Sequence, residues 1–178
     1  VLGAAELPKR PDIPLGLDAF MPVPEENPLT PEKIALGRRL FFDRRLSRDK
    51  KVACATCHQP ERAFTDGRAV AQGVFGRRGE RNAPALINRG YGAAFFWDGR
   101  IKTLEEQVLK PIQDPNEMDM TVAEAVERVR RDRKYRGLDE KGLSHALASY
   151  VRSLMSGDAP VDRYLNGQRE ALSEEARR

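Results

Sequence analysis

The cysteines and one histidine of this chain are concentrated in one short stretch, CATCH at residues 54–58. It holds both cysteines, Cys54 and Cys57, and His58, one of two histidines. Two thiols and an imidazole at this spacing could bind zinc, form a redox pair or a disulfide, or attach a haem.

Haem attachment explains these three side chains best. Thiols three residues apart can add to the two vinyl groups on one haem edge, and the adjacent imidazole can then ligate the iron. Zinc stays open, because the distant His145 could be a fourth ligand. A thioredoxin-like pair needs a βαβ unit that the sequence does not predict, and a disulfide across two residues stabilises little.

The second face of the iron decides between two kinds of protein. Met118 or Met120 as a sixth ligand would make an electron carrier. A carboxylate over an open iron, such as that of Glu117, could instead move a proton on bound peroxide. His145 is offset from the apolar stripe of its helix, so we expect it at the surface.

The elements that must position these residues are helices. No stretch alternates as a strand does, so the expected fold class is all-α. Thr30, Thr103 and Thr121 are the expected N-caps, and Gly157 is the expected stop of the last long helix. The expected helices are 29–43, 103–112, 121–132 and 138–157.

Two segments have no periodicity. Residues 1–28 contain six prolines and are expected to form an extended arm. Residues 64–100 contain seven glycines. Long loops of this kind are usually functional, so we expect this one to wrap a group that is not protein.

Composition and charge narrow the class further. The chain has 178 residues, of which 40% are apolar and 33% charged, as in a globular protein. No run approaches the roughly 20 apolar residues that span a bilayer, so we expect no membrane span. The net charge is +4, and the densest basic run is RVRRDRKYR at 128–136. No aromatic platform is interleaved with it, which favours a solvated helix end and no nucleic-acid partner.

Four segments in order resemble the N-terminal haem domain of the bacterial di-haem cytochrome c peroxidase and MauG-like family. They are CATCHQPERAFTDG, GERNAPALINRGYGAAFFWDGR, LEEQVLKPIQDPNEM and LASYVRSLMSGDAPVDRYL. The resemblance implies a cytochrome c-like helical domain with one haem c, attached through Cys54 and Cys57 and ligated by His58. It extends from about Pro28 to the last residue.

The resemblance also implies roles for further residues, and for two of them, Trp97 and Asn82, the residues alone do not suggest the role. Trp97 matches the tryptophan between two haems, and Asn82 matches a side chain that binds calcium at the domain interface. Gln107, Pro111 and Glu117 match the pocket where peroxide binds, with Glu117 as the acid and base. Without the resemblance, Trp97 would be interpreted as a packing aromatic and Asn82 as a turn residue.

One departure from the family pattern concerns the resting iron. Classical members carry a histidine in the loop after the haem motif, and it ligates the iron in the resting oxidised enzyme. This sequence has no histidine between His58 and His145. The resemblance therefore implies an iron that is open without reductive activation, as in the MauG-like branch.

The implied function is reduction of hydrogen peroxide, with electrons from a small cytochrome c or a cupredoxin. Two alternatives are a mono-haem electron carrier with His58 and Met118 or Met120 as ligands, and a MauG-like oxidant of a partner protein. We expect a periplasmic location, because haem attachment of this kind occurs outside the bacterial cytoplasm and the chain starts at Val1 without a leader. A homodimer is a further expectation.

The expected domains are an arm at 1–28, a peroxidatic haem domain at 29–171, and the start of a second haem domain at 172–178. The last assignment rests on an internal echo, since LTPEKIA at 29–35 is similar to LSEEARR at 172–178. No second C-x-x-C-H occurs in the chain, so we expect a fragment of a longer protein.

Overall fold

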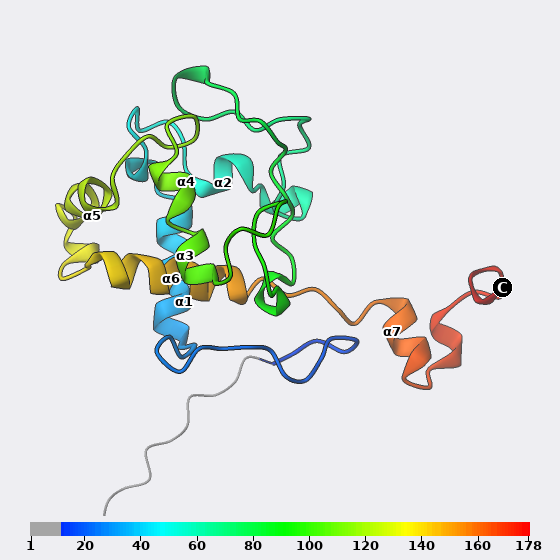
Figure 1. The fold of residues 1–178 in the computed structure, drawn as a ribbon. Coiled ribbons are helices and arrows are strands. Elements are labelled where there is room, and N and C mark those ends of the chain that lie inside the picture. Colours follow the sequence, from blue (N-terminus) through cyan, green and yellow to red (C-terminus); the bar gives the residue numbers. More distant parts are fainter. Residues whose placement is uncertain (1–11) are drawn as a thin grey trace, which may run out of the picture.

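The computed structural model describes residues 12–178, and residues 1–11 lie outside the description. This part of the chain is helical and has no strand, which confirms the predicted all-α class. The loop segments add three isolated antiparallel bridges. No helix within residues 12–178 is both long and apolar enough to cross a membrane. The helices are α1 (Pro31–Phe41), α2 (Cys54–Cys57), α3 (Leu104–Gln107), α4 (Lys110–Gln113), α5 (Val122–Arg130), α6 (Glu140–Arg152) and α7 (Pro160–Leu165) (Figure 1).

Helix α1 begins where its sequence predicts. The Thr30 hydroxyl accepts a hydrogen bond from the Lys33 amide at 3.2 Å, and Pro31 occupies the first helical position. A side-chain oxygen at the N-cap satisfies an amide that has no helical partner. Thr121 caps α5 in the same way, and Glu124 completes the predicted capping box.

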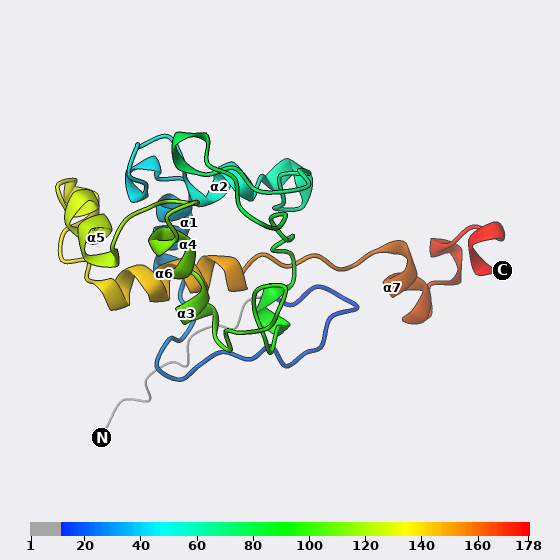
Figure 2. The ribbon, with the colours of Figure 1, turned by 45° about the horizontal axis from the view of Figure 1, so that its top comes forward.

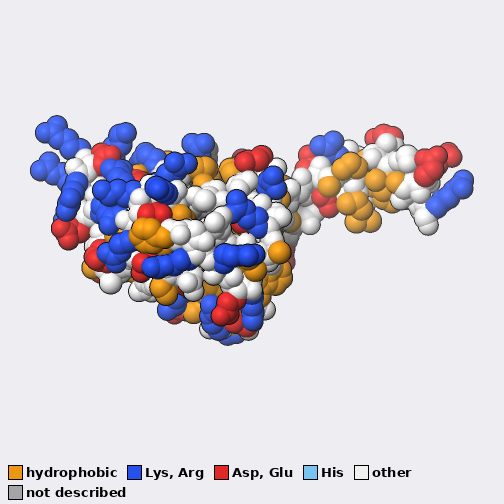
Figure 3. All heavy atoms as spheres, turned by 90° about the horizontal axis from the view of Figure 1, so that it is seen from above, with side chains coloured by type: hydrophobic (Ala, Val, Ile, Leu, Met, Phe, Trp, Pro, Cys, Tyr) orange, Lys and Arg blue, Asp and Glu red, His pale blue; other side chains and the backbone are white. Residues whose placement is uncertain are grey.

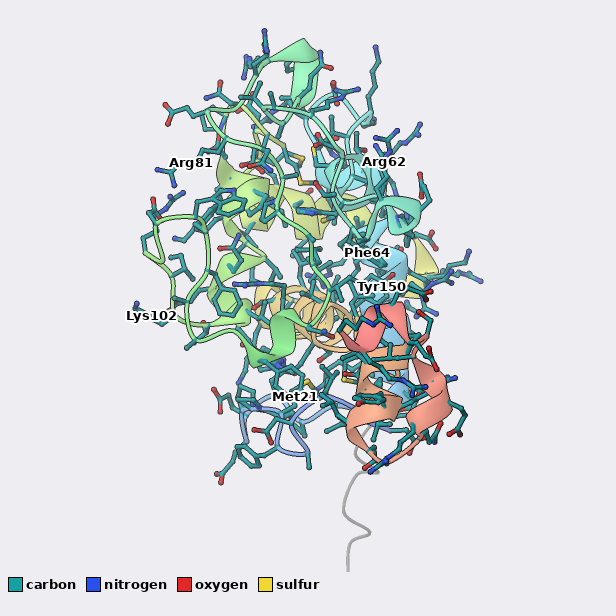
Figure 4. The ribbon with its side chains drawn as sticks, turned by 90° about the vertical axis from the view of Figure 1, so that its right-hand side faces the viewer. Met21, Arg62, Phe64, Arg81, Lys102 and Tyr150 are labelled. Atoms are coloured by element: carbon teal, nitrogen blue, oxygen red, sulfur yellow. The ribbon has the colours of Figure 1, made fainter. Side chains whose placement is uncertain are left out.

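Helices α1 and α6 cross and form the centre of the core (Figures 1 and 2). Gly37 makes the close approach, because a Cβ there would collide with the backbone carbonyl of Ala146. At the end of α1, the buried Phe41 ring packs edge-on against Tyr150 at 5.1 Å and Phe64 at 6.1 Å between centroids. Figure 4 labels Phe64 and Tyr150 and shows them near the end of α1.

The helix expected over 103–112 is two short helices, α3 and α4. Pro111 explains the break, because proline has no amide hydrogen and its ring crowds the carbonyl four residues earlier, that of Gln107. The Leu109 amide donates to Glu106 at 3.3 Å, as in a tighter turn. The break separates Gln107 from Pro111 without removing either from the cavity described below.

Helix α6 ends earlier than its sequence predicts. The expected stop is Gly157, but the last helical residue is Arg152. Beyond it, the Asn88 side chain bonds both the amide and the carbonyl of Ser156, at 2.8 and 2.9 Å. Gly157 has a different role, since a Cβ there would lie 2.6 Å from the Leu15 carbonyl. An extended segment then leads to α7, which stands apart from the main body (Figure 2).

A buried polar network fixes the N-terminal arm to the domain. Asn27 is fully buried and donates to Glu105 of α3 at 2.6 Å, while Lys33 donates to the Asn27 oxygen at 2.9 Å. Arg152 of α6 makes a two-pronged ion pair with Glu105 at 2.9 and 3.1 Å. Burial opposes ionisation of Glu105, but hydrogen bonds from Arg152 and Asn27 outweigh it and hold the pKa of this carboxyl below its usual value.

Candidate functional site

A cavity of about 320 Å³ lies between α2, the glycine-rich loop, and the α3–α4 segment. This volume is within the range of small-molecule and cofactor sites, and most of the wall is apolar. Eight of the predicted site residues lie on this wall, Met118 and seven others. The others are Cys54, Cys57, His58, Trp97, Gln107, Pro111 and Glu117.

Helix α2 is a single turn that brings the two thiols together. Residues three apart in a helix share a face, so Cys54 and Cys57 both reach the cavity. Both thiols are free of a disulfide. Burial raises the pKa of Cys54 to about 12 and that of Cys57 to about 11. Both are therefore protonated at neutral pH, unlike the reactive thiolate of a redox pair.

His58 follows α2 directly and has its orientation fixed by the backbone. Its Nδ1 lies 2.8 Å from the Phe64 carbonyl. With Nδ1 as the donor, Nε2 keeps its lone pair for a metal. Burial lowers the pKa of His58, which favours the neutral, ligating imidazole. Two thiols and a neutral imidazole on one wall fit the donor set of a covalently attached haem.

Gln107 and Glu117 place polar groups in an otherwise apolar cavity. The side-chain oxygen of Gln107 is buried and has no hydrogen-bond partner among residues 12–178. Burial and the nearby Asp114 carboxylate raise the pKa of Glu117 to about 7, against a smaller opposing effect of Arg100. An unpaired amide oxygen and a carboxyl that titrates near neutrality are both suited to a polar ligand.

The glycine-rich loop holds the Glu117 segment in place. The Val74 amide donates to the Glu117 carbonyl at 2.8 Å. Next to it, a Cβ at Gly73 would collide with the backbone of Asn116 and Glu117. Close backbone contact without a side chain is a reason for glycine at this position.

The two methionine candidates are separated by the fold. Met118 and Met120 are both buried in the apolar core, but only Met118 also lines the cavity. His145, the other histidine, does not line the cavity and is half-buried on α6.

Trp97 and Asn82 lie together at the cavity rim. Trp97 lines the cavity but remains 59% exposed, and its indole nitrogen donates to the Asn82 carbonyl at 3.1 Å. Asn82 itself does not line the cavity. In the described chain, no group of three or more His, Cys, Asp or Glu residues could hold a metal ion. Calcium binding at Asn82 therefore stays a prediction.

Two features of the site could not be predicted from the residue pattern. Ala63 and Phe64 both have positive φ, at 52° and 60°, and this turn directs the Phe64 carbonyl toward His58. Neither residue type signals such a conformation. The role of Gly73 is also hidden, because seven glycines occur in this loop and only the fold distinguishes them.

Comparison with known proteins identifies the family. The family model described as di-haem cytochrome c peroxidase matches residues 31–170. This chain belongs to the di-haem cytochrome c peroxidase family. Members of this family carry haem, and the match spans every predicted haem-binding and pocket residue.

Individual relatives agree with the family model. The methylamine utilization protein MauG of Methylophilus methylotrophus is 41% identical over 96% of this chain and 52% of its own length. The cytochrome c551 peroxidase of Pseudomonas aeruginosa is 34% identical over 86% of this chain and 49% of its own. A crystal structure of a MauG-like protein associated with microbial copper homeostasis has a TM-score of 0.79 at 37% identity, covering 89% of this chain and 51% of that one. The chain thus spans about half the length of the relatives it matches.

Proposed function

We propose that this chain forms the peroxidatic haem unit of a di-haem cytochrome c peroxidase and reduces hydrogen peroxide to water. One observation carries the proposal above all: a carboxyl with a pKa of about 7, that of Glu117, faces the same cavity as the C-x-x-C-H motif. A general acid and base works best when its pKa lies near the working pH.

The residues that would hold the cofactor are Cys54, Cys57 and His58. The thiols would hold the haem through its vinyl groups as thioethers, and the Phe64 carbonyl would keep the His58 ring oriented for ligation. When bound, the haem supplies an iron that binds peroxide and exchanges electrons with it.

Glu117 and Gln107 would handle the proton and the orientation of peroxide. As a carboxylate, Glu117 accepts the first proton of the peroxide, and as a carboxylic acid it returns a proton to the departing oxygen as water. The unpaired Gln107 oxygen can accept a hydrogen bond from the same molecule. Pro111 and the apolar wall around it limit the water that competes for this carboxyl.

The electrons would come from a small cytochrome c or a cupredoxin, through a second haem and past Trp97. Support comes from the exposed position of Trp97 at the rim and from the family match. We also propose a periplasmic location, calcium at Asn82 and a homodimer on the basis of the family. The domain limits 29–171 and 172–178 stay predictions.

Two observations favour other functions. Met118 lines the cavity, which favours a mono-haem electron carrier in which this thioether is the sixth ligand. The identity of 41% to a protein named MauG favours an oxidant that modifies a partner protein. Oxidation of a partner protein would use the same cavity and the same Glu117 as peroxide reduction.

The proposal is tested with Glu117→Gln in the haem-loaded chain. We expect turnover of peroxide with guaiacol to fall about 100-fold or more, because general acid and base catalysis is lost. The control is the same change at Glu106, an exposed residue of α3. Glu106→Gln should leave turnover unchanged. A low-spin ferric spectrum in the unmodified protein, which would show a sixth ligand, contradicts the peroxidase proposal and supports the carrier.

A further inference from the structure

A second hollow lies on the surface at the end of α1, and we call it the basic hollow. Its wall comes from the last turn of α1 and from the turns at 42–45 and 132–135. Five basic residues and two acidic residues line it, around one exposed aromatic ring, that of Phe42. Neither the haem attachment nor the proposed peroxide chemistry uses any of these side chains.

The charge of the basic hollow is not neutralised within the chain. Its two carboxylates, Asp43 and Asp132, both pair with Arg45, at 2.7 and 3.3 Å. No carboxylate of residues 12–178 forms an ion pair with the other basic residues of the wall. These residues are Arg38, Arg39, Arg44 and Lys134. The surface therefore presents several unpaired positive charges to a partner, and Figure 3 shows Lys and Arg side chains gathered on the side of the molecule that carries α5.

Aromatic rings connect this surface to the haem cavity. Phe42 is 43% exposed and lies 5.5 Å from the buried Phe41 ring, edge-on. Phe41 lines the cavity and lies 6.4 Å from the His58 ring, again between centroids. Arg38 lies over the outer ring, with its guanidinium 5.8 Å from the Phe42 centroid. Three rings thus lead in sequence from solvent to the side chain proposed to ligate the iron.

We propose that the basic hollow docks an acidic one-electron redox protein, which passes electrons to the haem through Phe42, Phe41 and His58. In each step the partner's metal loses one electron and the haem iron gains one. Two such transfers and two protons convert hydrogen peroxide to two waters. The proposal rests on the proposed function and adds an entry point separate from Trp97.

A redox protein fits this surface better than nucleic acid or a lipid headgroup. Those anions would also be attracted to the charges, but neither makes use of a ring sequence that ends at a metal ligand. Redox partners commonly use small interfaces steered by opposite charge, and one hollow around an exposed ring is of that scale.

The docking part is tested by calorimetric titration with plastocyanin, an acidic copper protein, at low ionic strength. The Arg39→Glu/Arg44→Glu variant should bind about tenfold more weakly than the unmodified chain, because it reverses two charges of the hollow. The control is Lys102→Glu/Lys141→Glu, which makes the same charge change at exposed sites outside the hollow. An equal loss in both variants, or none in either, overturns the proposal. A different pattern also overturns it. In that pattern plastocyanin binds neither the unmodified chain nor the Arg39→Glu/Arg44→Glu variant, while anionic vesicles or duplex DNA bind the unmodified chain and bind this variant less.

The electron path is tested by mixing reduced plastocyanin with the peroxide-treated, haem-loaded chain. At saturating plastocyanin, where affinity does not limit the rate, Phe42→Leu should slow electron transfer severalfold. Phe20→Leu, another exposed ring, should not. Equal rates in both variants overturn the path. Guaiacol, which is small and uncharged, is run in parallel. If the unmodified chain does not turn over guaiacol, the proposed peroxidase function fails, while the affinity comparison still decides on the hollow.

Discussion

At the scale of single residues, Glu117 has the property that the proposed chemistry needs most. Burial and Asp114 raise its pKa to about 7, so both protonation states are populated near neutral pH. A carboxyl with an ordinary pKa would hold almost no proton there. The apolar wall and the Gly73 contact that fix this segment therefore matter to the chemistry as well as to the packing.

Met118 separates the enzyme from the electron carrier. Met118→Leu roughly conserves volume, so we expect a stability loss below about 1.5 kcal/mol. If the face of the iron near Met118 is open, the ferric absorption spectrum and peroxide turnover should both stay nearly unchanged. Met120→Leu, in the core away from the cavity, is the matched control. Conversion from a low-spin to a high-spin spectrum in Met118→Leu alone would assign this residue as the ligand and reject the peroxidase proposal.

At the scale of elements, the arm depends on the ion pair between Glu105 and Arg152. Glu105→Gln leaves the Arg152 charge buried without its partner, so the free energy of unfolding should fall by about 3 kcal/mol at pH 7. Glu106→Gln, which is exposed, should change it by less than about 0.5 kcal/mol. Denaturant unfolding of both variants gives the comparison.

The pH dependence of this effect has a defined sign. In the folded chain the pKa of Glu105 lies below its ordinary value of 4.5. The contribution of this carboxylate to the free energy of unfolding is therefore present above pH 4.5 and is lost as the pH falls through the folded pKa. The stability difference between the unmodified chain and Glu105→Gln should therefore shrink on acidification below about pH 4. If the difference stays constant from pH 7 to pH 3, the ion pair between Glu105 and Arg152 is not its source.

The helices also show how much of the fold was predictable. The first residue of a helix such as α1 could be predicted, because its N-cap residue, Thr30, directly precedes the helix in sequence. The end of α6 could not, because it depends on Asn88, which is 68 residues from Ser156. In the site, the haem motif follows from residue type and spacing alone. Glu117 was a candidate from residue type, and the resemblance placed it with Gln107 and Pro111 in the pocket. The Phe64 carbonyl came from neither.

At the scale of the whole molecule, the loop at 64–100 and the helices enclose one cavity. The loop has few backbone hydrogen bonds to the rest of the described domain, among them those of Val74 and Asn88. A bound haem would fill the space between the loop and α3 and give the loop a surface to pack on. Its order should therefore depend on the cofactor more than that of the α1–α6 crossing does.

Hydrogen exchange measures this dependence directly. Without haem, amides within 64–100 should exchange much faster than in the loaded chain, while those of α6 should change little. The control is the Cys54→Ala/Cys57→Ala variant, which cannot attach haem. Its amides should exchange at the same rates as those of the unmodified chain prepared without haem. Equal loop protection with and without haem would show that the loop does not pack on the cofactor.

The most direct test of the central claim is the rate at which hydrogen peroxide reacts with the ferric, haem-loaded chain, measured by stopped flow from pH 6 to 8. In the proposed function Glu117 takes the first proton as a carboxylate, so the rate should rise with pH through about 7. In Glu117→Gln it should be at least about 100-fold lower and independent of pH in this range. Equal rates and equal pH profiles in the two proteins would contradict the assignment of Glu117 as the acid and base of this cavity.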